Sequence, residues 1–387
     1  AIARAPDGRV VFVRGGAPDE RVEARLTQVK RRFLRAEVER VARPGPTRVE
    51  PPCRHYHACG GCDLMHVDPD AQGELLLAAG LEVLARVGGV ARRREDVRFW
   101  RGDALGARTR ARLAVRGGVV GFRARRSHEV VRIDRCLALH PRLDAAREAL
   151  AELASGRAVD GVEEVELATD GHEVAIHLSS ALEPLAGALR AKGFRVLAPG
   201  DRPEGGELTV RDAAGEMVLR PGVFSQASLQ GNAALLEAVT DELPRRGRFA
   251  VELHAGSGNF TRLLPARFAR VLAVERSAEA VALGRRATGA AVEWRARSAL
   301  AGWREATRSQ APDVLLVDPP RAGLEPGLAE AIGERPPAMM LYVSCDVGTL
   351  ARDLRRLTAA GLRVTTVRAL DLYPQTAHLE WCVTLTR

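Results

Sequence analysis

The chain has 387 residues, of which 46% are hydrophobic and 28% are charged, and its formal net charge is +9. A chain of this length and composition buries a sizeable core and is expected to fold into two or three domains. No stretch approaches the roughly 18 consecutive apolar residues of a membrane span, and the first thirty residues lack a secretory signal. We therefore expect a cytoplasmic protein with no membrane partner.

Positive charge is concentrated in two segments. Residues 92–135 contain fourteen arginines against five acidic residues, and residues 21–43 contain eight basic against three acidic residues. A phosphate backbone is attracted to such segments, so nucleic acid is the expected partner. A general arginine excess is the alternative, because Lys30 and Lys192 are the only lysines.

Residues 1–48 are predicted to form a small β-barrel. Stretches at 8–15, 21–30 and 33–43 alternate in polarity as strands do, and glycine and proline residues interrupt them. The following segment, 43–52, has four prolines in ten residues and is expected to be a linker.

Three of the six cysteines lie within ten residues, at Cys53, Cys59 and Cys62. In a long chain with no export signal, unevenly spaced cysteines favour a metal or catalytic site over disulfides. Zinc is one candidate, because these three thiolates and His66 would supply four ligands.

Residues 49–215 are predicted to form a central α+β domain. The leucines of residues 71–87 are spaced like one face of a helix. Strands are expected over 109–115, 119–123 and 129–133, the first two joined by a glycine turn. Residues 145–215 mix helix and strand patterns without recognisable chemistry.

From residue 216 to residue 387, apolar strands alternate with helical stretches. The strand sequences are RFAVEL, RVLAVE, DVLLVD, MMLYVS and RVTTVRAL. This alternation is typical of a mostly parallel sheet covered by helices, so we expect a Rossmann-like α/β domain. The ligands of such sheets bind at the carboxyl ends of the strands.

The first strand end carries the glycine loop VELHAGSGNF. Gly256 and Gly258 allow a tight turn close to a ligand, and Asn259 can hydrogen-bond it. Glu275 follows at a spacing that suits the two hydroxyls of a ribose. The loop lacks the third glycine of a dinucleotide site and a Walker lysine, which favours S-adenosylmethionine over NAD and ATP. A plain strand-to-helix turn is the alternative.

Three further strand ends carry reactive groups. Asp318 leaves a strand and meets two prolines that fix the backbone. Cys345 lies between a strand and a helix whose dipole would stabilise the nucleophilic thiolate, with a small buried hydrophobe as the alternative. Glu380 enters the last strand among apolar neighbours, so burial is expected to raise its pKa toward that of a proton acceptor.

In this order, the motifs resemble those of the RNA uracil-5 methyltransferase family over almost the whole chain. The family's Phe-x-Gln, Gly-x-Gly-Asn-Phe, Asp-Pro-Pro-Arg, Ser-Cys and His-x-Glu elements are matched at Phe224 and Gln226, Gly256 to Phe260, Asp318 to Arg321, Ser344 and Cys345, and His378 and Glu380. The first residues resemble the family's TRAM domain, a small OB-like RNA-binding barrel.

The resemblance implies a class I methyltransferase that uses S-adenosylmethionine. Cys345 would add to C6 of uracil, C5 would take the methyl group, and Glu380 would remove the C5 proton. The implied cofactor site consists of Gln226, His254, Gly256, Gly258, Asn259, Glu275 and Asp318. The implied substrate site consists of Phe224, Gln226, Asp318 and Arg321.

The resemblance also implies a metal centre. The three clustered cysteines and Cys136 match the ligands of a [4Fe-4S] cluster in one branch of the family, and four thiolates suit such a cluster chemically. Zinc is the alternative. The barrel and the cluster occur together in the ribosomal branch, so RNA is the implied partner, with ribosomal RNA favoured and transfer RNA the alternative. We expect a monomer in which the cluster braces the RNA-binding face.

Some positions depart from the family pattern. Asp346 and Val347 stand where the family has Asn-Pro, and a carboxylate at position 346 would raise the pKa of the neighbouring thiol. His254 replaces an aromatic residue and Ser228 replaces an asparagine. These departures leave two rival functions, a catalytically silent RNA chaperone and a methyltransferase acting on a small molecule or a protein.

Overall fold

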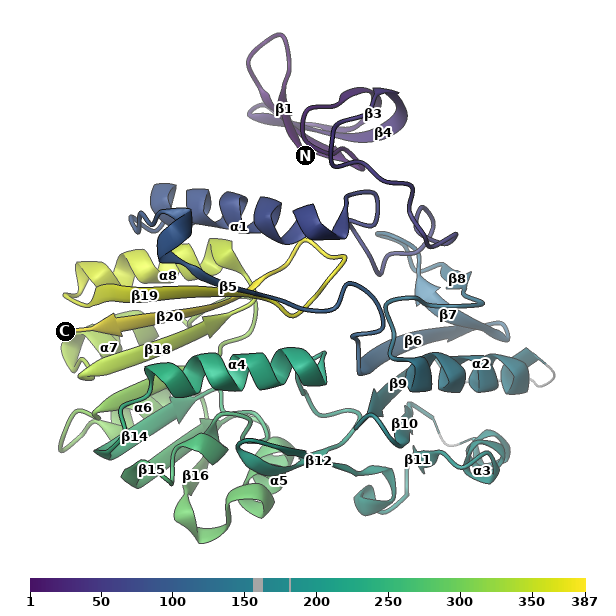
Figure 1. The fold of residues 1–387 in the computed structure, drawn as a ribbon. Coiled ribbons are helices and arrows are strands. Elements are labelled where there is room, and N and C mark those ends of the chain that lie inside the picture. Colours follow the sequence, from purple (N-terminus) through teal and green to yellow (C-terminus); the bar gives the residue numbers. More distant parts are fainter. Residues whose placement is uncertain (156–162, 181) are drawn as a thin grey trace.

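The structure is a computed structural model that describes residues 1–155, 163–180 and 182–387. Within these ranges the strands form sheets of four, six and eight strands and one two-stranded hairpin. In Figure 1 the four-stranded sheet lies at the top, the eight-stranded sheet at the left and the six-stranded sheet at the right. No helix in the described ranges is both long and apolar enough to cross a membrane.

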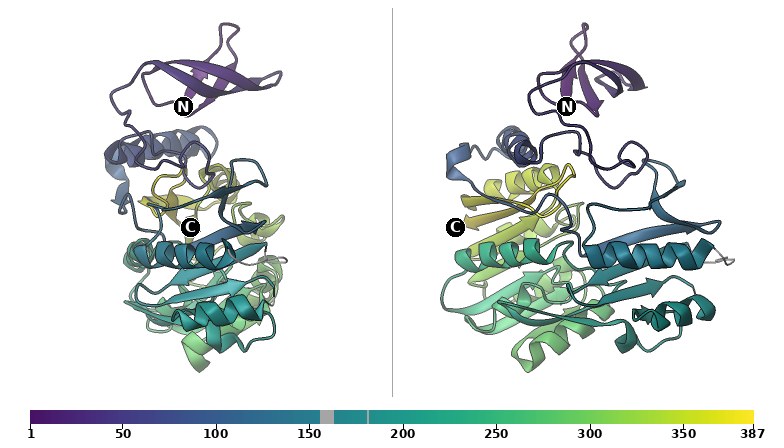
Figure 2. Two further views of the ribbon diagram at one scale, coloured as in Figure 1. Left: turned by 90° about the vertical axis from the view of Figure 1, so that its right-hand side faces the viewer. Right: turned by 45° about the vertical axis from the view of Figure 1, so that its right-hand side comes forward.

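The N-terminal sheet contains the three predicted strands and one more. Its order is β1-β2-β4-β3, and it lies at one end of the molecule in every view (Figure 1 and Figure 2). A core of only four buried side chains holds it together, and β3 is exposed along most of its length. In the described residues the four strands pair in this order, and the small barrel expected of residues 1–48 stays a prediction. The strands are β1 (Ile2–Arg4), β2 (Val10–Arg14), β3 (Arg21–Val29) and β4 (Phe33–Arg43).

The central sheet has the order β11-β10-β9-β6-β7-β8, and its three predicted strands are β6, β7 and β8. Helices α2 and α3 pack on one face, and the hairpin β12–β13 packs against β10. The elements are β6 (Arg110–Arg116), β7 (Val119–Arg123), β8 (Val130–Arg132), α2 (Pro141–Ser155), β9 (Glu164–Thr169), β10 (Val174–Leu178), α3 (Glu183–Ala191), β11 (Arg195–Leu197), β12 (Leu208–Asp212) and β13 (Gly215–Leu219).

The C-terminal sheet has the order β16-β15-β14-β17-β18-β20-β19-β5. Strands β14 to β18 are parallel, as predicted, whereas β20 runs antiparallel to both of its neighbours. The elements are α4 (Leu229–Glu242), β14 (Gly247–Leu253), β15 (Phe268–Glu275), α5 (Ala278–Thr288), β16 (Glu293–Ala296), α6 (Ala299–Ala306), β17 (Val314–Val317), α7 (Leu328–Glu334), β18 (Met339–Ser344), α8 (Val347–Ala359), β19 (Arg363–Asp371) and β20 (Glu380–Thr386).

Part of the segment 49–215 packs on this C-terminal sheet. Helix α1 (Pro69–Arg86), the predicted helix, joins α6, α7 and α8 in covering one face, and α4 and α5 cover the other. Strand β5 (Arg98–Arg101) pairs in parallel with β19 at the edge of the sheet. The cysteine-bearing segment before α1 is therefore tied to both of the large sheets.

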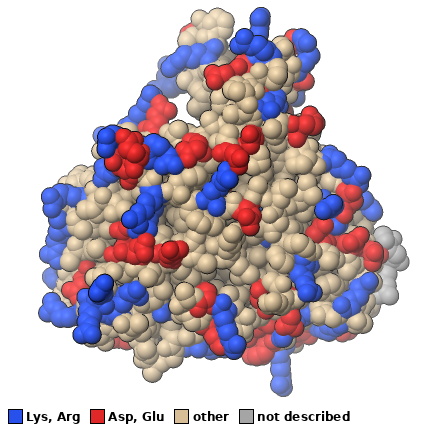
Figure 3. Space-filling model, in the orientation of Figure 1, with Lys and Arg blue, Asp and Glu red and all other residues tan. Residues whose placement is uncertain are grey.

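Many arginines of residues 92–135 pair with carboxylates from other segments. Arg94 lies 2.7 Å from Glu74, and Arg110 lies 3.0 Å from Glu166. On the face drawn in Figure 3, basic and acidic side chains are interspersed over the three sheets. The arginine excess in the sequence is thus spread over ion pairs on this face and does not form one uniform basic surface there.

Helix packing predicts opposite effects for two glycine substitutions, one in α1 and one in α3. A Cβ at Gly80 would overlap the indole ring of Trp381, which is 2% exposed, so Gly80→Ala should lower the free energy of unfolding by about 1–3 kcal/mol. A Cβ at Gly187 in α3 meets nothing closer than 3.9 Å. Gly187→Ala should therefore raise the free energy of unfolding by about 0.5–1 kcal/mol. Urea denaturation measures both, and a stabilising Gly80→Ala would contradict this packing.

Candidate active site

One edge of the C-terminal sheet collects the reactive groups. The parallel strands β14, β17 and β18 end at this edge, and the antiparallel strand β20 begins there. Ser344, the last residue of β18, pairs with Trp381 of β20. Continuing this register by one residue sets Cys345 opposite Glu380. Residues 35 positions apart in the sequence therefore meet because of the antiparallel strand.

A cavity of about 780 Å³ opens at this edge. Its lining contains almost every site residue predicted from the sequence, namely Phe224, Gln226, His254, Gly256, Asn259, Glu275, Asp318, Arg321, Cys345 and Glu380. Gly258 does not line it. Its φ of +94° makes the turn, and a Cβ there would lie 3.4 Å from the ring of Trp294, so this glycine serves the turn and its packing.

The glycine loop is held in place by its neighbours. Glu275 accepts hydrogen bonds from the backbone N–H of Gly256 (3.0 Å) and of Ser277 (2.8 Å). The amides of Asn232 and Asn259 bond reciprocally at 2.9 and 2.7 Å. A carboxylate and an amide are thus fixed on the cavity wall, where they suit ribose hydroxyls and polar groups of a ligand.

Two buried polar atoms in the cavity wall have no hydrogen-bond partner in the described residues. They are Oε1 of Gln226 and Nε2 of His254. Gln226 also donates from Nε2 to Asp318 at 3.5 Å, and burial lowers the pKa of His254. An unpartnered buried polar atom costs free energy, so this wall fits a polar ligand such as S-adenosylmethionine.

The thiol of Cys345 is not ionised by its helix in the way the sequence suggested. Burial, with Glu380 as the next cause, raises its pKa to about 11. Arg321 opposes this shift through its charge and a hydrogen bond to the thiol. The expected thiolate-stabilising environment is thus outweighed by burial, and the nearby guanidinium is the group that favours ionisation.

Two of the residues that depart from the family pattern, Asp346 and Ser228, cap the N-termini of helices. The Asp346 carboxylate caps α8 by accepting from the N–H of Thr349 at 2.8 Å, and it is not among the main groups that shift the pKa of Cys345. The helix end thus engages the carboxylate of Asp346, and its expected effect on the pKa of Cys345 stays a prediction. Ser228 caps α4 by accepting from the N–H of Gly231 at 3.1 Å.

Two buried carboxyls face the thiol. Burial raises the pKa of Glu380 well above its usual range, with Asp318 as the next cause, and burial raises the pKa of Asp318 to about 7. Tyr373 opposes the shift of Glu380 and lines the same cavity. Sequence reasoning missed this tyrosine, although its place seven residues before the predicted base was an available signal. A carboxylate made more basic in this way suits proton removal from carbon.

Comparison with known proteins identifies this arrangement. Residues 204–387 match the family profile described as tRNA (Uracil-5-)-methyltransferase, and residues 1–38 match the TRAM domain. A 23S rRNA (uracil(1939)-C(5))-methyltransferase RlmD from Halomonas elongata is 36% identical, with 98% of this chain and 85% of that protein aligned. Its counterpart from Chromohalobacter salexigens is 33% identical, with 100% and 86% aligned. This chain belongs to the RNA uracil-5 methyltransferase family.

A solved structure gives the same fold for this methyltransferase over its whole length. It is the Pyrococcus abyssi tRNA (uracil-54, C5)-methyltransferase in complex with S-adenosyl-L-homocysteine, with a TM-score of 0.74, 23% identity, and 100% and 99% of the two chains aligned. The prediction of an N-terminal TRAM domain joined to a C-terminal class I methyltransferase fold is therefore confirmed.

The four predicted metal ligands of the methyltransferase line a second cavity, of about 460 Å³. They are Cys53, Cys59, Cys62 and Cys136. His66, the fourth ligand of the zinc alternative, is not among the lining residues, since Nδ1 bonds the hydroxyl of Tyr56 at 2.6 Å and Nε2 lies 3.2 Å from the carbonyl of Gly16. Within the described residues, no group of three or more histidine, cysteine or acidic side chains is placed to hold a metal ion.

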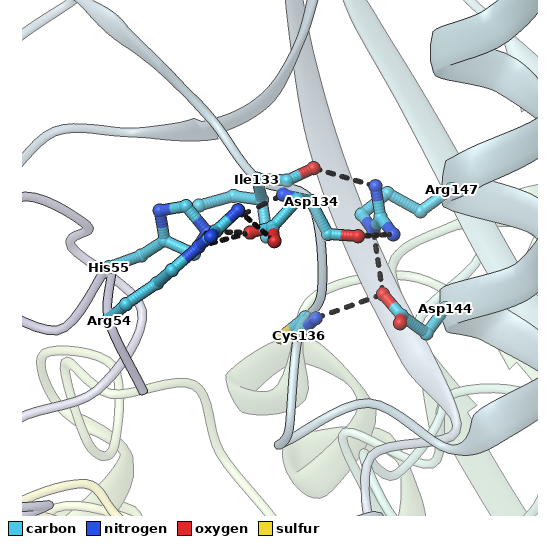
Figure 4. A network of polar contacts seen from close by, with 7 residues as sticks. All are labelled: Arg54, His55, Ile133, Asp134, Cys136, Asp144 and Arg147. Carbon is cyan, nitrogen blue, oxygen red and sulfur yellow. Dashed lines mark hydrogen bonds and ion pairs between the residues drawn. The ribbon is translucent and has the colours of Figure 1, made fainter. Parts of the chain in front are cut away.

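A network of polar contacts fixes the loop that carries Cys136 (Figure 4). Asp134 accepts from Arg54 of the cysteine segment at 3.0 Å. Arg147, which is 2% exposed, donates to the carbonyl of Asp134 and to Asp144, both at 2.6 Å. Asp144 also accepts from the N–H of Cys136 at 3.0 Å. The two cysteine-bearing segments are thus joined outside the cavity itself.

The contact of Arg321 with the thiol predicts a change in cysteine reactivity. Arg321→Gln removes the cation, so the pKa of Cys345 should rise further and its alkylation by iodoacetamide at pH 8 should slow by about tenfold per pKa unit. Arg321→Lys keeps the charge and should slow alkylation less. Mass spectrometry of the Cys345 peptide measures the rates, and an unchanged pH profile in Arg321→Gln would refute this role.

Proposed function

We propose that this methyltransferase forms 5-methyluridine in ribosomal RNA, with Cys345 as the nucleophile and Glu380 as the general base. The observation that carries the proposal is the meeting of one thiol, two buried carboxyls and one guanidinium on the wall of a cavity of about 780 Å³. A cavity of this size is within the usual range for small-molecule sites. The retained reactive groups disfavour a silent RNA chaperone.

The reaction begins with covalent attack on the base. After its thiol proton has passed to solvent, Cys345 adds to C6 of uracil, and the resulting enolate makes C5 nucleophilic. S-adenosylmethionine supplies the methyl group that C5 takes. Glu380 then removes the C5 proton, the bond between C6 and sulfur breaks, and the thiolate leaves. The charge of Arg321 lowers the pKa of the thiol, so it favours the thiolate both before attack and after release.

The residues next to the glycine loop would hold the methyl donor in this part of the cavity. Glu275 would bind the ribose hydroxyls, and Asn259 would contact a polar group of the donor. Gln226 Oε1 and His254 Nε2 are the unpartnered atoms available to it. Gln226 and Asp318 lie within hydrogen-bond distance of each other, so one pair of side chains can reach both the donor and the base.

The target nucleotide enters past Phe224. Its base must be flipped out, because C5 and C6 are covered in a stacked helix. The Phe224 ring is 62% exposed, and Arg110 lies 5.9 Å from its centroid. The ring lines both the active-site cavity and the cysteine cavity. An exposed aromatic ring beside an arginine suits stacking on an RNA base.

A further hollow, of about 480 Å³, supports contact with the RNA strand at the N-terminal sheet. Four arginines from three segments line it, and the nearby ring of Phe12 is 45% exposed. Guanidinium groups bind phosphates, and an exposed ring can stack on a base. The arginines are Arg14, Arg35, Arg125 and Arg126.

Ribosomal RNA is favoured as the substrate by the relatives that align along almost the whole chain. Those from Halomonas elongata and Chromohalobacter salexigens are both named as 23S rRNA methyltransferases. The transfer-RNA enzyme of similar fold is only 23% identical. Transfer RNA is the alternative substrate.

The cysteine cavity is proposed to hold a [4Fe-4S] cluster. The four thiols line one hollow, and four thiolates are the usual ligand set of such a cluster. Arg108, Arg110, Arg112 and Arg135 line the same hollow. These cations would offset the negative charge of a cluster with four thiolate ligands.

The two catalytic residues are predicted to fail differently when replaced. Cys345→Ala should give neither methylated RNA nor a covalent complex, since nothing else activates C5. Glu380→Gln should allow attack and methyl transfer but lose the base, a contribution of roughly 10² to 10⁴ in rate. It should then accumulate a methylated protein–RNA adduct, seen as a shifted, label-bearing band on a denaturing gel.

The substrate in this experiment is a 23S ribosomal RNA fragment, with a transfer-RNA T-arm as the comparison. Adduct formation by Cys345→Ala would reassign the nucleophile, and Cys382 would then be tested. Normal turnover by Glu380→Gln would remove it as the base. Methylation of the T-arm alone would replace ribosomal RNA by transfer RNA as the substrate.

Protein purified without oxygen is predicted to be brown, with broad absorbance near ~400 nm and about four irons per chain. Cys136→Ser should lose most of the iron, because one of four ligands is gone. The matched control is Cys382→Ser, since Cys382 is buried in the C-terminal sheet. A colourless protein with one equivalent of zinc would contradict the cluster.

A further inference from the structure

Backbone hydrogen bonds join the segment with the first three cysteines to the segment that leads to the base. We name residues 53–64 the cysteine loop and residues 372–379 the catalytic loop. The carbonyl of Gln375 accepts from the N–H of Asp63 at 2.7 Å and of Leu64 at 3.1 Å. Asp63 follows Cys62 directly. One carbonyl of the catalytic loop is therefore bound to the end of the cysteine loop.

Gln375 adopts a backbone conformation that its residue type disfavours. Its φ is +67°, in the left-handed region, and its side chain is 2% exposed. A residue other than glycine holds such a conformation only where its surroundings enforce it, and such positions gather at functional sites. The surroundings here are the cysteine loop and helix α1.

Gln72 of α1 completes the junction. Its Nε2 lies within 3.0 Å of three acceptors, which are the carbonyls of Leu64 and Val67 and the Oε1 of Gln375. Its Oε1 accepts from the N–H of Gln375 at 3.3 Å. Gln72 is 3% exposed, so loss of this amide would leave several buried polar groups without partners.

The catalytic loop connects the fixed position of Gln375 to the reacting groups. Thr376 donates to the carbonyl of Tyr373 at 2.7 Å, which closes the turn around Gln375. Tyr373 lines both the active-site and the cysteine cavities, and the catalytic loop ends directly before Glu380, the first residue of β20. A movement of Gln375 would therefore move both Tyr373 and the segment that leads to the base.

We propose that Gln72 and Gln375 are positioning residues that make the placement of Glu380 depend on the order of the cysteine loop. A disordered cysteine loop releases the Gln375 carbonyl, the catalytic loop relaxes from its left-handed turn, and the segment that leads to Glu380 loses its fixed position. The proposal rests on the proposed function only in taking Glu380 as the base. It gives the cysteine site a role in the proton-removal step, in addition to the bracing of an RNA-binding face.

The test compares Gln72→Leu with Gln310→Leu, the same change at an exposed glutamine far along the chain. In Gln72→Leu, amide hydrogen exchange across residues 374–380 should speed up by about tenfold or more. The rate constant kcat should fall while KM for RNA and the affinity for S-adenosylmethionine stay unchanged. The methylated protein–RNA adduct should accumulate, as in Glu380→Gln. Gln310→Leu should match the unmodified protein in every measurement.

Two further variants keep the proposal falsifiable. If Gln72→Leu does not fold, Gln375→Gly replaces it, because it keeps the backbone acceptor and suits a positive φ but loses the side-chain partner of Gln72. Cys62→Ala should speed exchange across 374–380 as well. Unchanged exchange there in Cys62→Ala would overturn the link to the cysteines. Adduct accumulation in Glu380→Gln but not in Gln72→Leu would overturn the positioning role alone, whereas its absence in both would overturn the proposed function.

Discussion

The antiparallel entry of β20 between β18 and β19 is the constraint on which the site depends. A fully parallel sheet would bring only strand ends to the ligand-binding edge. Because β20 starts at that edge, Glu380 lies opposite Cys345 by continuation of the β18–β20 register. The same reversal requires a loop between β19 and β20, and that loop reaches past the edge to the cysteine-bearing segment. The direction of β20 therefore sets both the position of Glu380 opposite Cys345 and the contact between the β19–β20 loop and the cysteine-bearing segment.

Burial governs the chemistry of the groups gathered there. It raises the pKa of Cys345 to about 11 and of Asp318 to about 7, and it raises that of Glu380 well above its usual range. A thiol and two carboxyls so close together cannot all be charged without strong repulsion. Arg321 lies among them and opposes the shift of the thiol. The guanidinium is thus the neighbouring group that favours the charged form of the thiol.

The cysteine-bearing segment occupies the middle of the molecule. Its N-terminal side follows the TRAM sheet, its arginine and aspartate contacts tie it to the central sheet (Figure 4), and its C-terminal side bonds to the catalytic loop. The proposed cluster of four thiolates would crosslink this segment to the segment that carries Cys136. Its role would be structural, because the proposed chemistry needs no electron transfer.

The sequence by itself determined the strand and helix pattern of the C-terminal domain, since apolar period and glycine turns are local properties. It also determined the identity of the cavity-lining groups, because Asp318, Cys345 and Glu380 stand at strand ends. Tertiary structure alone decided the rest. The pKa of Cys345 depends on burial and on Arg321, the carboxylate of Asp346 is engaged by a helix end, and the Nδ1 of His66 is engaged by the hydroxyl of Tyr56. Each of these interactions depends on a partner that is distant in the sequence or on how deeply one atom is buried. Neither property can be read from a local sequence pattern.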